Sequence, residues 1–313
     1  MEKYIILADI TCDLTREMRE FVGMEDYVKG HISITDGGET KDYLTDLDWE
    51  HLERDYFYSS LDNTKAKVVT SPPNLDEYID IFTKYVKEGY AILSMSISSK
   101  ISGTYDFSCV AARKVQESYP EAKIYCFDSL RMSGAFGLLT FYAHLLKNEG
   151  KTYEEVIEWL EANKTRVHQM GPIDDLIVIA RRGRITMGKA IFGSFAGVKP
   201  MGDCNSDGYV TVITKAKGIR KALDITTEYV KRTVVDAENC YAIVSHTDRA
   251  QYAEILAEKV RETVGFKKVF VSESFSGNAT NIGTGMIGVY YFGEEVSPEL
   301  EKEKAIMAEI CGK

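Results

Sequence analysis

Two hydroxyl-rich segments of this 313-residue chain have the composition of an anion-binding turn. In the first, the apolar run 91–97 gives way to the segment Ser-Ser-Lys-Ile-Ser-Gly-Thr, after which a helical pattern begins. A helix that begins where a strand ends has unpaired N–H groups in its first turn, with the positive end of the helix dipole behind them. The hydroxyls of Ser99, Ser102 and Thr104 add donors, and Gly103 leaves the backbone open to a ligand. This chemistry suits a small acidic group.

The second segment has the same construction. A short apolar strand leads into Thr70-Ser71-Pro-Pro-Asn74, and a helical pattern follows. We expect Thr70 and Ser102 to follow strands of one sheet and to meet at its carboxyl edge, where open α/β sheets bind ligands. The alternative is that both segments only cap helices, because Ser, Thr and Asn are preferred at helix starts and Pro in the first turn.

Other chemically active residues form less specific patterns. Asp9, Thr11 and Asp13 end the first expected strand, where they would bind a metal or sugar or, as is more common, accept hydrogen bonds from loop amides. The five histidines and six cysteines show no paired ligand spacing, so we expect no metal. His246 is expected at a helix start, without a functional role.

A glycine-containing segment offers a different function. Residues 183–189 (Gly-Arg-Ile-Thr-Met-Gly-Lys) match the core of a phosphate-binding loop, but Ala190 replaces the hydroxyl that would bind magnesium. A small-molecule kinase or other nucleotide-dependent enzyme is therefore kept as the alternative function. Arg181, Arg182 and Arg184 make this loop basic, which fits either a solvated loop or docking of an acidic ligand group or partner protein.

Composition limits the classes of function. The net charge of −10 argues against nucleic-acid binding, which needs concentrated Lys and Arg. No apolar run approaches the roughly 18 residues of a membrane span. An expected strand begins almost at the first residue, so we expect no signal peptide. The singly spaced cysteines fit buried thiols of a cytoplasmic protein.

Strands and helices alternate along the first half of the chain, which indicates βαβ units and a doubly wound, mostly parallel sheet. Besides the helix after each hydroxyl-rich turn, we expect helices at 13–21, 49–60, 133–147 and 152–167, and strands at 4–8, 27–35, 68–69, 91–97 and 123–127.

The pattern changes near residue 166, which indicates a domain boundary. We expect an N-terminal α/β domain over residues 1–166 and a C-terminal α/β domain with a mixed sheet over residues 167–313. In the second domain we expect strands at 173–180, 198–201, 209–214, 241–245, 268–272 and 286–291, and helices at 188–195, 218–233, 249–263 and from Ser297 onward.

An ordered set of short motifs resembles the DegV family over residues 4–292. The matching segments are the Asp9-Ile-Thr-Cys-Asp-Leu start (family DSTxDL), Thr70-Ser-Pro-Pro (TSxP), Ser98-Ser-Lys-Ile-Ser-Gly-Thr-Tyr (SSxLSGTY), Asp128-Ser (DS), Gly183-Arg-Ile (GRI), Lys199-Pro (KP) and the glycine-rich loop 283–288.

The resemblance implies a two-domain binding protein without catalysis or cofactor, which holds a long-chain fatty acid in a cleft between its domains. The acyl chain would enter an apolar tunnel, and the protein would present the fatty acid to a separate kinase that makes acyl phosphate. Arg184 would act at the mouth of the cleft or on the kinase. The residues implied at the fatty-acid carboxylate are Thr70, Ser71, Ser99, Ser102, Gly103, Thr104 and Asn281.

One departure from the family bears on the kinase. Kinase-coupled members have a histidine two residues before the glycine that corresponds to Gly283, and this chain has Asn281 there. Asn can donate and accept hydrogen bonds, but it cannot become cationic near neutral pH. We therefore expect carboxylate binding to be kept and coupling to acyl phosphate synthesis to be weakened or altered.

Overall fold

The computed structural model describes residues 3–312 apart from residue 175 and residues 187–196. The chain forms two compact units. Unit 1 is Met1–Lys164 together with Phe275–Thr280, and unit 2 is Thr165–Ser274 together with Asn281–Lys313. Unit 1 is thus completed by a segment from far along the chain.

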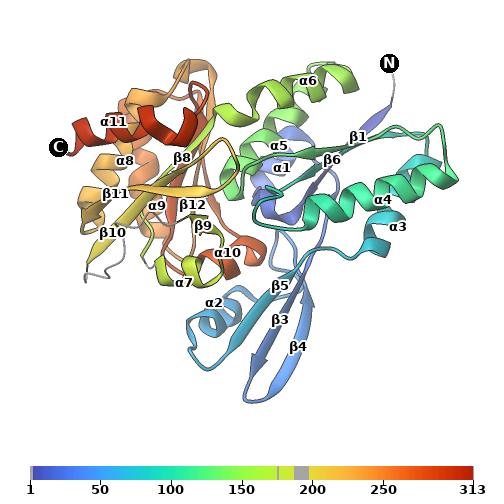
Figure 1. The fold of residues 1–313 in the computed structure, drawn as a ribbon, viewed down its shortest axis with the longest axis horizontal. Coiled ribbons are helices and arrows are strands. Elements are labelled where there is room, and N and C mark those ends of the chain that lie inside the picture. Colours follow the sequence, from blue (N-terminus) through green and yellow to red (C-terminus); the bar gives the residue numbers. More distant parts are fainter. Residues whose placement is uncertain (1–2, 175, 187–196, 313) are drawn as a thin grey trace. The chain divides into compact units, whose positions relative to one another are not determined.

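Unit 1 is built on a parallel sheet with the strand order β2-β1-β6-β7. This confirms the parallel sheet that the alternation of strands and helices predicts. The strands are β1 (Tyr4–Asp9), β2 (Tyr27–Val28), β6 (Ala91–Ser96) and β7 (Ile124–Asp128), and the helices beside them in Figure 1 are α3 (Leu75–Lys87), α4 (Thr104–Ser118), α5 (Ser133–Asn148) and α6 (Tyr153–Asn163).

Strand β1 shows why helices cover both faces of this sheet. All six of its residues are buried, and successive side chains point to opposite faces. Ile5 and Leu7 pack with apolar side chains of α3 and α4. Tyr4, on the other face, contacts Tyr153 of α6, with ring centroids 5.9 Å apart. Because both faces are buried, the strand is apolar from Tyr4 to Ala8, and only its last residue, Asp9, is charged.

A second sheet in unit 1 is antiparallel and corrects one expectation. Its order is β4-β3-β5, formed by β3 (His31–Asp36), β4 (Glu39–Leu44) and β5 (Lys67–Ser71), with α2 (Arg54–Asp62) packed on it. The strand that carries Thr70 therefore does not belong to the parallel sheet, and the premise that Thr70 and Ser102 share one sheet edge is wrong. A short apolar alternation predicts a strand but does not select its partner.

The expected strand 27–35 is divided between these two sheets. Residues 27–28 pair with β1, and the chain then turns at Gly30 into β3. A Cβ on Gly30 would lie 3.2 Å from both the Ser71 carbonyl oxygen and the Thr45 hydroxyl. The remaining short elements of this unit are the 3₁₀ turn η1 (Ile10–Cys12) and helix α1 (Arg16–Val22).

Unit 2 contains the expected mixed sheet. Its order is β13-β12-β14-β8, in which β12 and β13 are parallel and the other pairs antiparallel. The strands are β8 (Val167–Met170), β12 (Tyr241–His246), β13 (Lys268–Glu273) and β14 (Ile287–Phe292). A smaller sheet has the order β10-β11-β9, from β9 (Ile185–Thr186), β10 (Val198–Cys204) and β11 (Val210–Lys217).

The helices of unit 2 bury its sheets. Helices α8 (Ile219–Thr233) and α9 (Ala250–Val264) pack on β12 and β14 through a core that includes Leu223, Val230 and Leu256. The remaining elements are α10 (Ser276–Ile282), α11 (Glu301–Ile310) and the 3₁₀ turns η2 (Lys164–Arg166), η3 (Ala237–Asn239) and η4 (Pro298–Leu300). Helix α10 begins in unit 1 and ends in unit 2, and η2 begins in unit 1 and ends in unit 2 as well.

The strand expected over 173–180 is wrong, because this segment contains helix α7 (Leu176–Arg181). Leu176, Ile179 and Ala180 pack in one apolar cluster with Val212. Their spacing of three and four residues is that of one helix face. A short apolar run does not by itself separate a strand from a buried helix. The helix expected over 188–195 lies outside the described residues.

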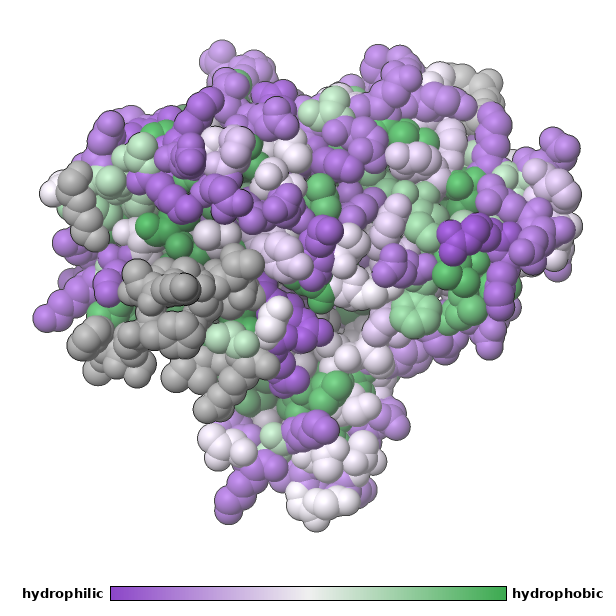
Figure 2. All heavy atoms as spheres, in the orientation of Figure 1, coloured by the Kyte–Doolittle hydropathy of each residue, from purple (hydrophilic) through white to green (hydrophobic). Residues whose placement is uncertain are grey.

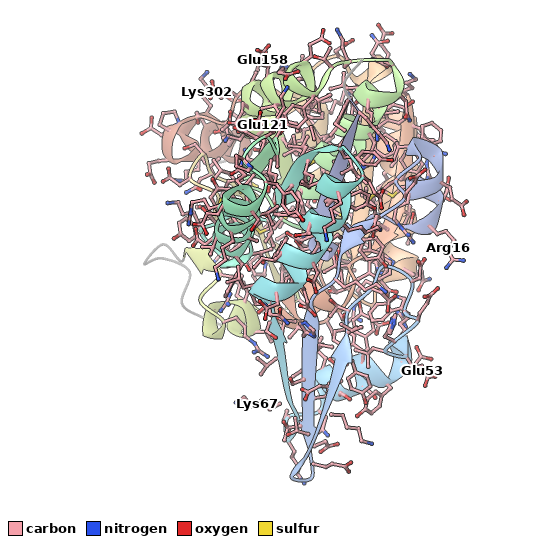
Figure 3. The ribbon with its side chains drawn as sticks, turned by 90° about the vertical axis from the view of Figure 1, so that its right-hand side faces the viewer. Arg16, Glu53, Lys67, Glu121, Glu158 and Lys302 are labelled. Carbon is pink, nitrogen blue, oxygen red and sulfur yellow. The ribbon has the colours of Figure 1, made fainter. Side chains whose placement is uncertain are left out.

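Hydrophilic side chains are common on the face of the molecule that Figure 2 draws. Figure 3 shows charged side chains such as Arg16, Glu53 and Lys67 extending outward. Among the residues that the structure describes, no helix has the length and apolar character needed to cross a bilayer.

Candidate functional site

The turn after β6 lies where the sequence places it, between a parallel strand and a helix. Strand β6 ends at Ser96, and α4 begins at Thr104 with Gly103 as its N-cap residue. The Ser102 Oγ lies 2.8 Å from the Thr104 Oγ1 and accepts a hydrogen bond from the Thr104 N–H at 3.4 Å. Ser102 and Thr104 are thus joined at the start of α4, while the N-cap residue itself is Gly103 and makes no side-chain capping bond.

Gly103 keeps the backbone of this turn accessible. It is exposed, and a Cβ at this position would meet only the ring of Phe107, at 3.8 Å. Ser102 is half-buried and Thr104 is buried. The turn therefore offers hydroxyls and open backbone together, without a nearby side chain shielding Gly103.

Two carboxylates hold the turn in place from the carboxyl edge of the sheet. The Ile97 N–H donates to the Asp9 Oδ2 at 2.9 Å, and the Ser99 N–H donates to the Asp128 Oδ1 at 3.1 Å. Burial raises the pKa of Asp9, while hydrogen bonds from Thr11 and Ile97 act in the opposite direction. Asp9 and Asp128 therefore act here as acceptors for loop amides.

Asp13 also serves as an acceptor, and it contacts residues that spacing along the chain does not reveal. Its backbone is left-handed (φ 52°). Its carboxylate accepts the Ser133 hydroxyl at 2.6 Å, the Phe275 N–H at 3.0 Å and the Asn278 side-chain amide at 2.7 Å. The loop-amide interpretation is confirmed for Asp9 and Asp13, whereas the Thr11 hydroxyl donates to the Asp9 carboxylate. Across the described part of the chain, His, Cys, Asp and Glu side chains form no group of three or more suited to hold a metal ion.

The turn that contains Thr70 begins inside a strand and ends in a helix cap. Thr70 pairs with Ile32 in the antiparallel sheet and is half-buried, and the exposed Ser71 ends the strand. Asn74 caps α3 by accepting the Glu77 N–H at 3.0 Å, and the Glu77 carboxylate accepts the Asn74 N–H at 2.8 Å. The capping interpretation is confirmed for Asn74, and the binding role of Thr70 and Ser71 stays a prediction.

Asn281 lies near the end of α10, before a loop that requires glycine. Gly283 and Gly285 have φ values of +83° and +101°. A Cβ on Gly285 would lie 2.4 Å from the Asp174 carboxyl group. The positive φ values and this close contact explain why the loop has glycine at these two positions. Asn281 is half-buried in unit 2, and its role at the carboxylate stays a prediction.

A cluster of two cations and one carboxylate in unit 2 was not predicted. Asp174 accepts a hydrogen bond from Lys199 at 2.6 Å and one from the Arg249 Nη2 at 3.0 Å. Lys199 belongs to the Lys-Pro motif, but nothing in the spacing of the sequence indicates its partners. Asp248 lies 3.9 Å from the Arg249 Nη1, so the two cations are balanced by two carboxylates.

Arg184 is exposed and its guanidinium donates to the Arg182 carbonyl oxygen. This fits either a solvated or a partner-facing side chain. The second half of the phosphate-loop match, Gly188-Lys189, lies outside the described residues. His246 accepts the Arg249 N–H at 3.2 Å, just before α9. His246 is the last residue of β12, so it lies at a strand end and not at the helix start that the sequence analysis expects, although its ring accepts an N–H group from the N-cap residue of α9.

The comparisons with known proteins identify the class. A sequence model of the DegV family, described as uncharacterised proteins, matches residues 3–294. A DegV domain-containing protein of Clostridium perfringens is 30% identical over 95% of this chain and 100% of its own length. The chain therefore belongs to the DegV family, as the motifs of the sequence indicate.

Solved structures show the same fold. A DegV family protein from Thermus thermophilus, whose structure is described as showing fatty acid binding, matches with a TM-score of 0.81 at 21% identity, over 94% of this chain and 100% of that one. The fatty acid kinase B3 protein of Streptococcus pneumoniae, loaded with linoleic acid, matches with a TM-score of 0.77 at 19% identity, over 93% and 100%. At these identities the likeness establishes the DegV fold of the present chain.

Proposed function

We propose that this protein binds a long-chain fatty acid and presents it to a fatty acid kinase. The observation that carries the proposal is the turn from Ser98 to Thr104, where hydroxyls and open backbone meet at the carboxyl end of a parallel strand. Family membership and the fatty acids bound by solved relatives support the same ligand.

The proposed carboxylate site uses neutral donors. In this proposal Ser102 accepts the Thr104 N–H and points its own proton to a ligand oxygen. Hydrogen bonds to a charged group contribute about 1.5–3 kcal/mol each. The other residues assigned to the carboxylate are Thr70, Ser71, Ser99, Gly103, Thr104 and Asn281.

The acyl chain supplies most of the affinity in this proposal. Burial of each methylene contributes roughly 0.8 kcal/mol, so a long chain outweighs the carboxylate contacts. We assign no catalytic residue and no cofactor to the protein, and we assign Arg184 to contact with the kinase or with the entrance of the ligand site.

Mass spectrometry of the purified protein tests the proposal. Protein prepared without added lipid is extracted with organic solvent, and its extract is compared with that of an unrelated protein from the same cells. We expect a stoichiometric long-chain fatty acid. An extract without fatty acid, combined with a rise in melting temperature on addition of ATP, would instead support the nucleotide-dependent enzyme.

A further inference from the structure

Two thiols meet inside unit 1, in the layer between the parallel sheet and its helices. Cys109 lies in the second turn of α4, and Cys126 lies on β7, against which α4 packs. Both side chains are half-buried, and their thiols interact with each other. The proposed fatty-acid function assigns no role to this pair.

The surroundings favour the thiolate on Cys109. Hydrogen bonding from Cys126 lowers the pKa of the Cys109 thiol, burial opposes this, and Tyr105, Ser108 and the positive charge of Arg113 lower it further. The pKa of Cys126 is raised by the same interaction and by burial. A thiolate is the nucleophilic form of cysteine, so the pair consists of one activated and one protonated thiol.

Buried hydroxyls near the thiols have unused hydrogen-bonding capacity. Ser94 is the cross-strand neighbour of Cys126, and Ser96 lies two residues further along the same face of β6. Both hydroxyls are buried and make no hydrogen bond of ordinary geometry to the described residues. The buried Tyr78 phenol lies near Ser96 and both thiols. Buried polar groups are normally paired, so this cluster has donors available for a newly formed oxygen.

We infer that Cys109 is a site of oxidation by hydrogen peroxide and that Cys126 resolves it into a disulfide between α4 and β7. The Cys109 thiolate attacks one peroxide oxygen: an S–O bond forms, the O–O bond breaks, and hydroxide leaves and takes up a proton as water. Cysteine is thereby oxidised to sulfenic acid and peroxide is reduced.

The second step joins the two sulfurs. The Cys126 sulfur attacks the sulfenic sulfur of Cys109, an S–S bond forms, and the S–O bond breaks. The leaving hydroxide takes the Cys126 proton and departs as a second water. Two thiols and one peroxide thus give one disulfide and two waters, and a thiol reductant reverses the modification.

Cys12, Cys204 and Cys240 have different surroundings. Cys12 and Cys204 are fully buried, and burial raises the pKa of Cys12. Cys240 is half-buried like Cys109, but its thiol donates to the Val235 carbonyl oxygen at 3.7 Å. Cys240 is therefore a control of similar exposure whose thiol donates to a backbone carbonyl oxygen.

Thiol mapping of the full-length protein tests the inference. Reduced protein is treated with hydrogen peroxide, quenched with an alkylating reagent and digested without reductant. We expect a crosslinked peptide pair containing Cys109 and Cys126, lighter by two hydrogen atoms than its separate reduced peptides, while Cys240 remains alkylated. Alkylation of both Cys109 and Cys126 after treatment, or earlier oxidation of Cys240, overturns the inference.

Two variants separate the steps. Cys126→Ser should stop the reaction at sulfenic acid on Cys109, which a dimedone probe labels, and Cys109→Ser should abolish both the label and the disulfide. Cys240→Ser should leave the disulfide unchanged. Equal dimedone labelling of Cys126→Ser and Cys109→Ser contradicts the assignment of Cys109. The wild-type mapping does not depend on the folding of any variant.

Discussion

At the scale of single residues, the turn before α4 contains backbone N–H groups that hold the turn together and side-chain hydroxyls that we assign to the ligand. Most of its backbone N–H groups already have acceptors: the Ile101 and Ser102 N–H groups donate to the Ser98 carbonyl, and the Ser99 N–H donates to Asp128. The side-chain hydroxyl of Ser102 is therefore a better ligand donor than these amides. The proposed carboxylate contact is therefore made by the Ser102 Oγ, which a substitution of Ser102 can remove.

We expect Ser102→Ala and Thr70→Val each to weaken fatty-acid binding by about 1.5–3 kcal/mol, because each removes one hydrogen bond to a charged oxygen. Isothermal titration calorimetry with one saturated fatty acid measures the loss. Ser118→Ala, an exposed serine at the end of α4, should bind as the wild type does. Wild-type affinity in both site variants would remove these residues from the carboxylate site.

At the scale of elements, the sequence predicts those whose pattern is local. The long amphipathic helices follow from periodicity, the buried strands β1, β6, β12 and β14 follow from short apolar runs, and the cap of α3 follows from residue type. Three features depend on partners far along the chain and were missed: the antiparallel placement of β5, helix α7, and the return of Phe275–Thr280 to unit 1. Spacing carries no signal for the contact between Asp13 and Asn278, which are 265 residues apart.

Gly171 lies against the backbone of Ile287 and Gly288, so a substitution at this position tests the packing of the unit 2 sheet. A Cβ there would lie 1.9 Å from the Ile287 carbonyl oxygen, so the backbone must shift. We expect Gly171→Ala to lower the free energy of unfolding by about 2–3 kcal/mol in urea titrations.

Gly277→Ala is the control for this substitution. Gly277 lies within α10, and the nearest atom to its added Cβ is a Thr11 methyl at 3.4 Å. This variant should be neutral or more stable by up to about 1 kcal/mol, because alanine is the better helix former. Equal losses in both variants would show that backbone crowding at Gly171 is not the cause.

At the scale of the whole molecule, pH acts on the two units through two buried histidines. In unit 2, the His168 Nδ1 lies 2.8 Å from the Asp203 Oδ2, which also accepts the Tyr229 hydroxyl at 2.9 Å. Burial disfavours the charged ring, but the charge and hydrogen bond of Asp203 outweigh it, so the pKa of His168 is raised. In unit 1, burial lowers the pKa of His144 to about 3.

These opposite shifts predict opposite pH dependences. The stabilisation by charged His168 is complete below the ordinary histidine pKa of about 6.5 and is lost as the pH rises through the raised folded-state value. His168→Phe should therefore cost about 3–5 kcal/mol at pH 6, since it leaves Asp203 without its cation, and less at pH 9. His144 is held neutral by burial, so protonation of this histidine favours the unfolded chain. Compared with His144→Phe, the wild type should therefore lose free energy of unfolding as the pH falls below about 6.5. Urea titrations at several pH values test both trends, and parallel pH profiles would contradict them.

Presentation to a kinase requires a surface that binding itself does not use, and Arg184 offers the clearest test. Its side chain is exposed, and its guanidinium donates a hydrogen bond to the Arg182 carbonyl oxygen. Arg184→Ala should therefore change folding stability by less than about 0.5 kcal/mol and leave fatty-acid affinity near that of the wild type. Phosphorylation of bound fatty acid by a cognate kinase should fall, because the substitution removes an exposed cation from the basic loop that we assign to the kinase contact. Arg220→Ala, at an exposed arginine of α8, controls for loss of positive charge in unit 2. Equal losses of binding and phosphorylation in Arg184→Ala would assign this residue to the ligand site and remove it from the kinase surface.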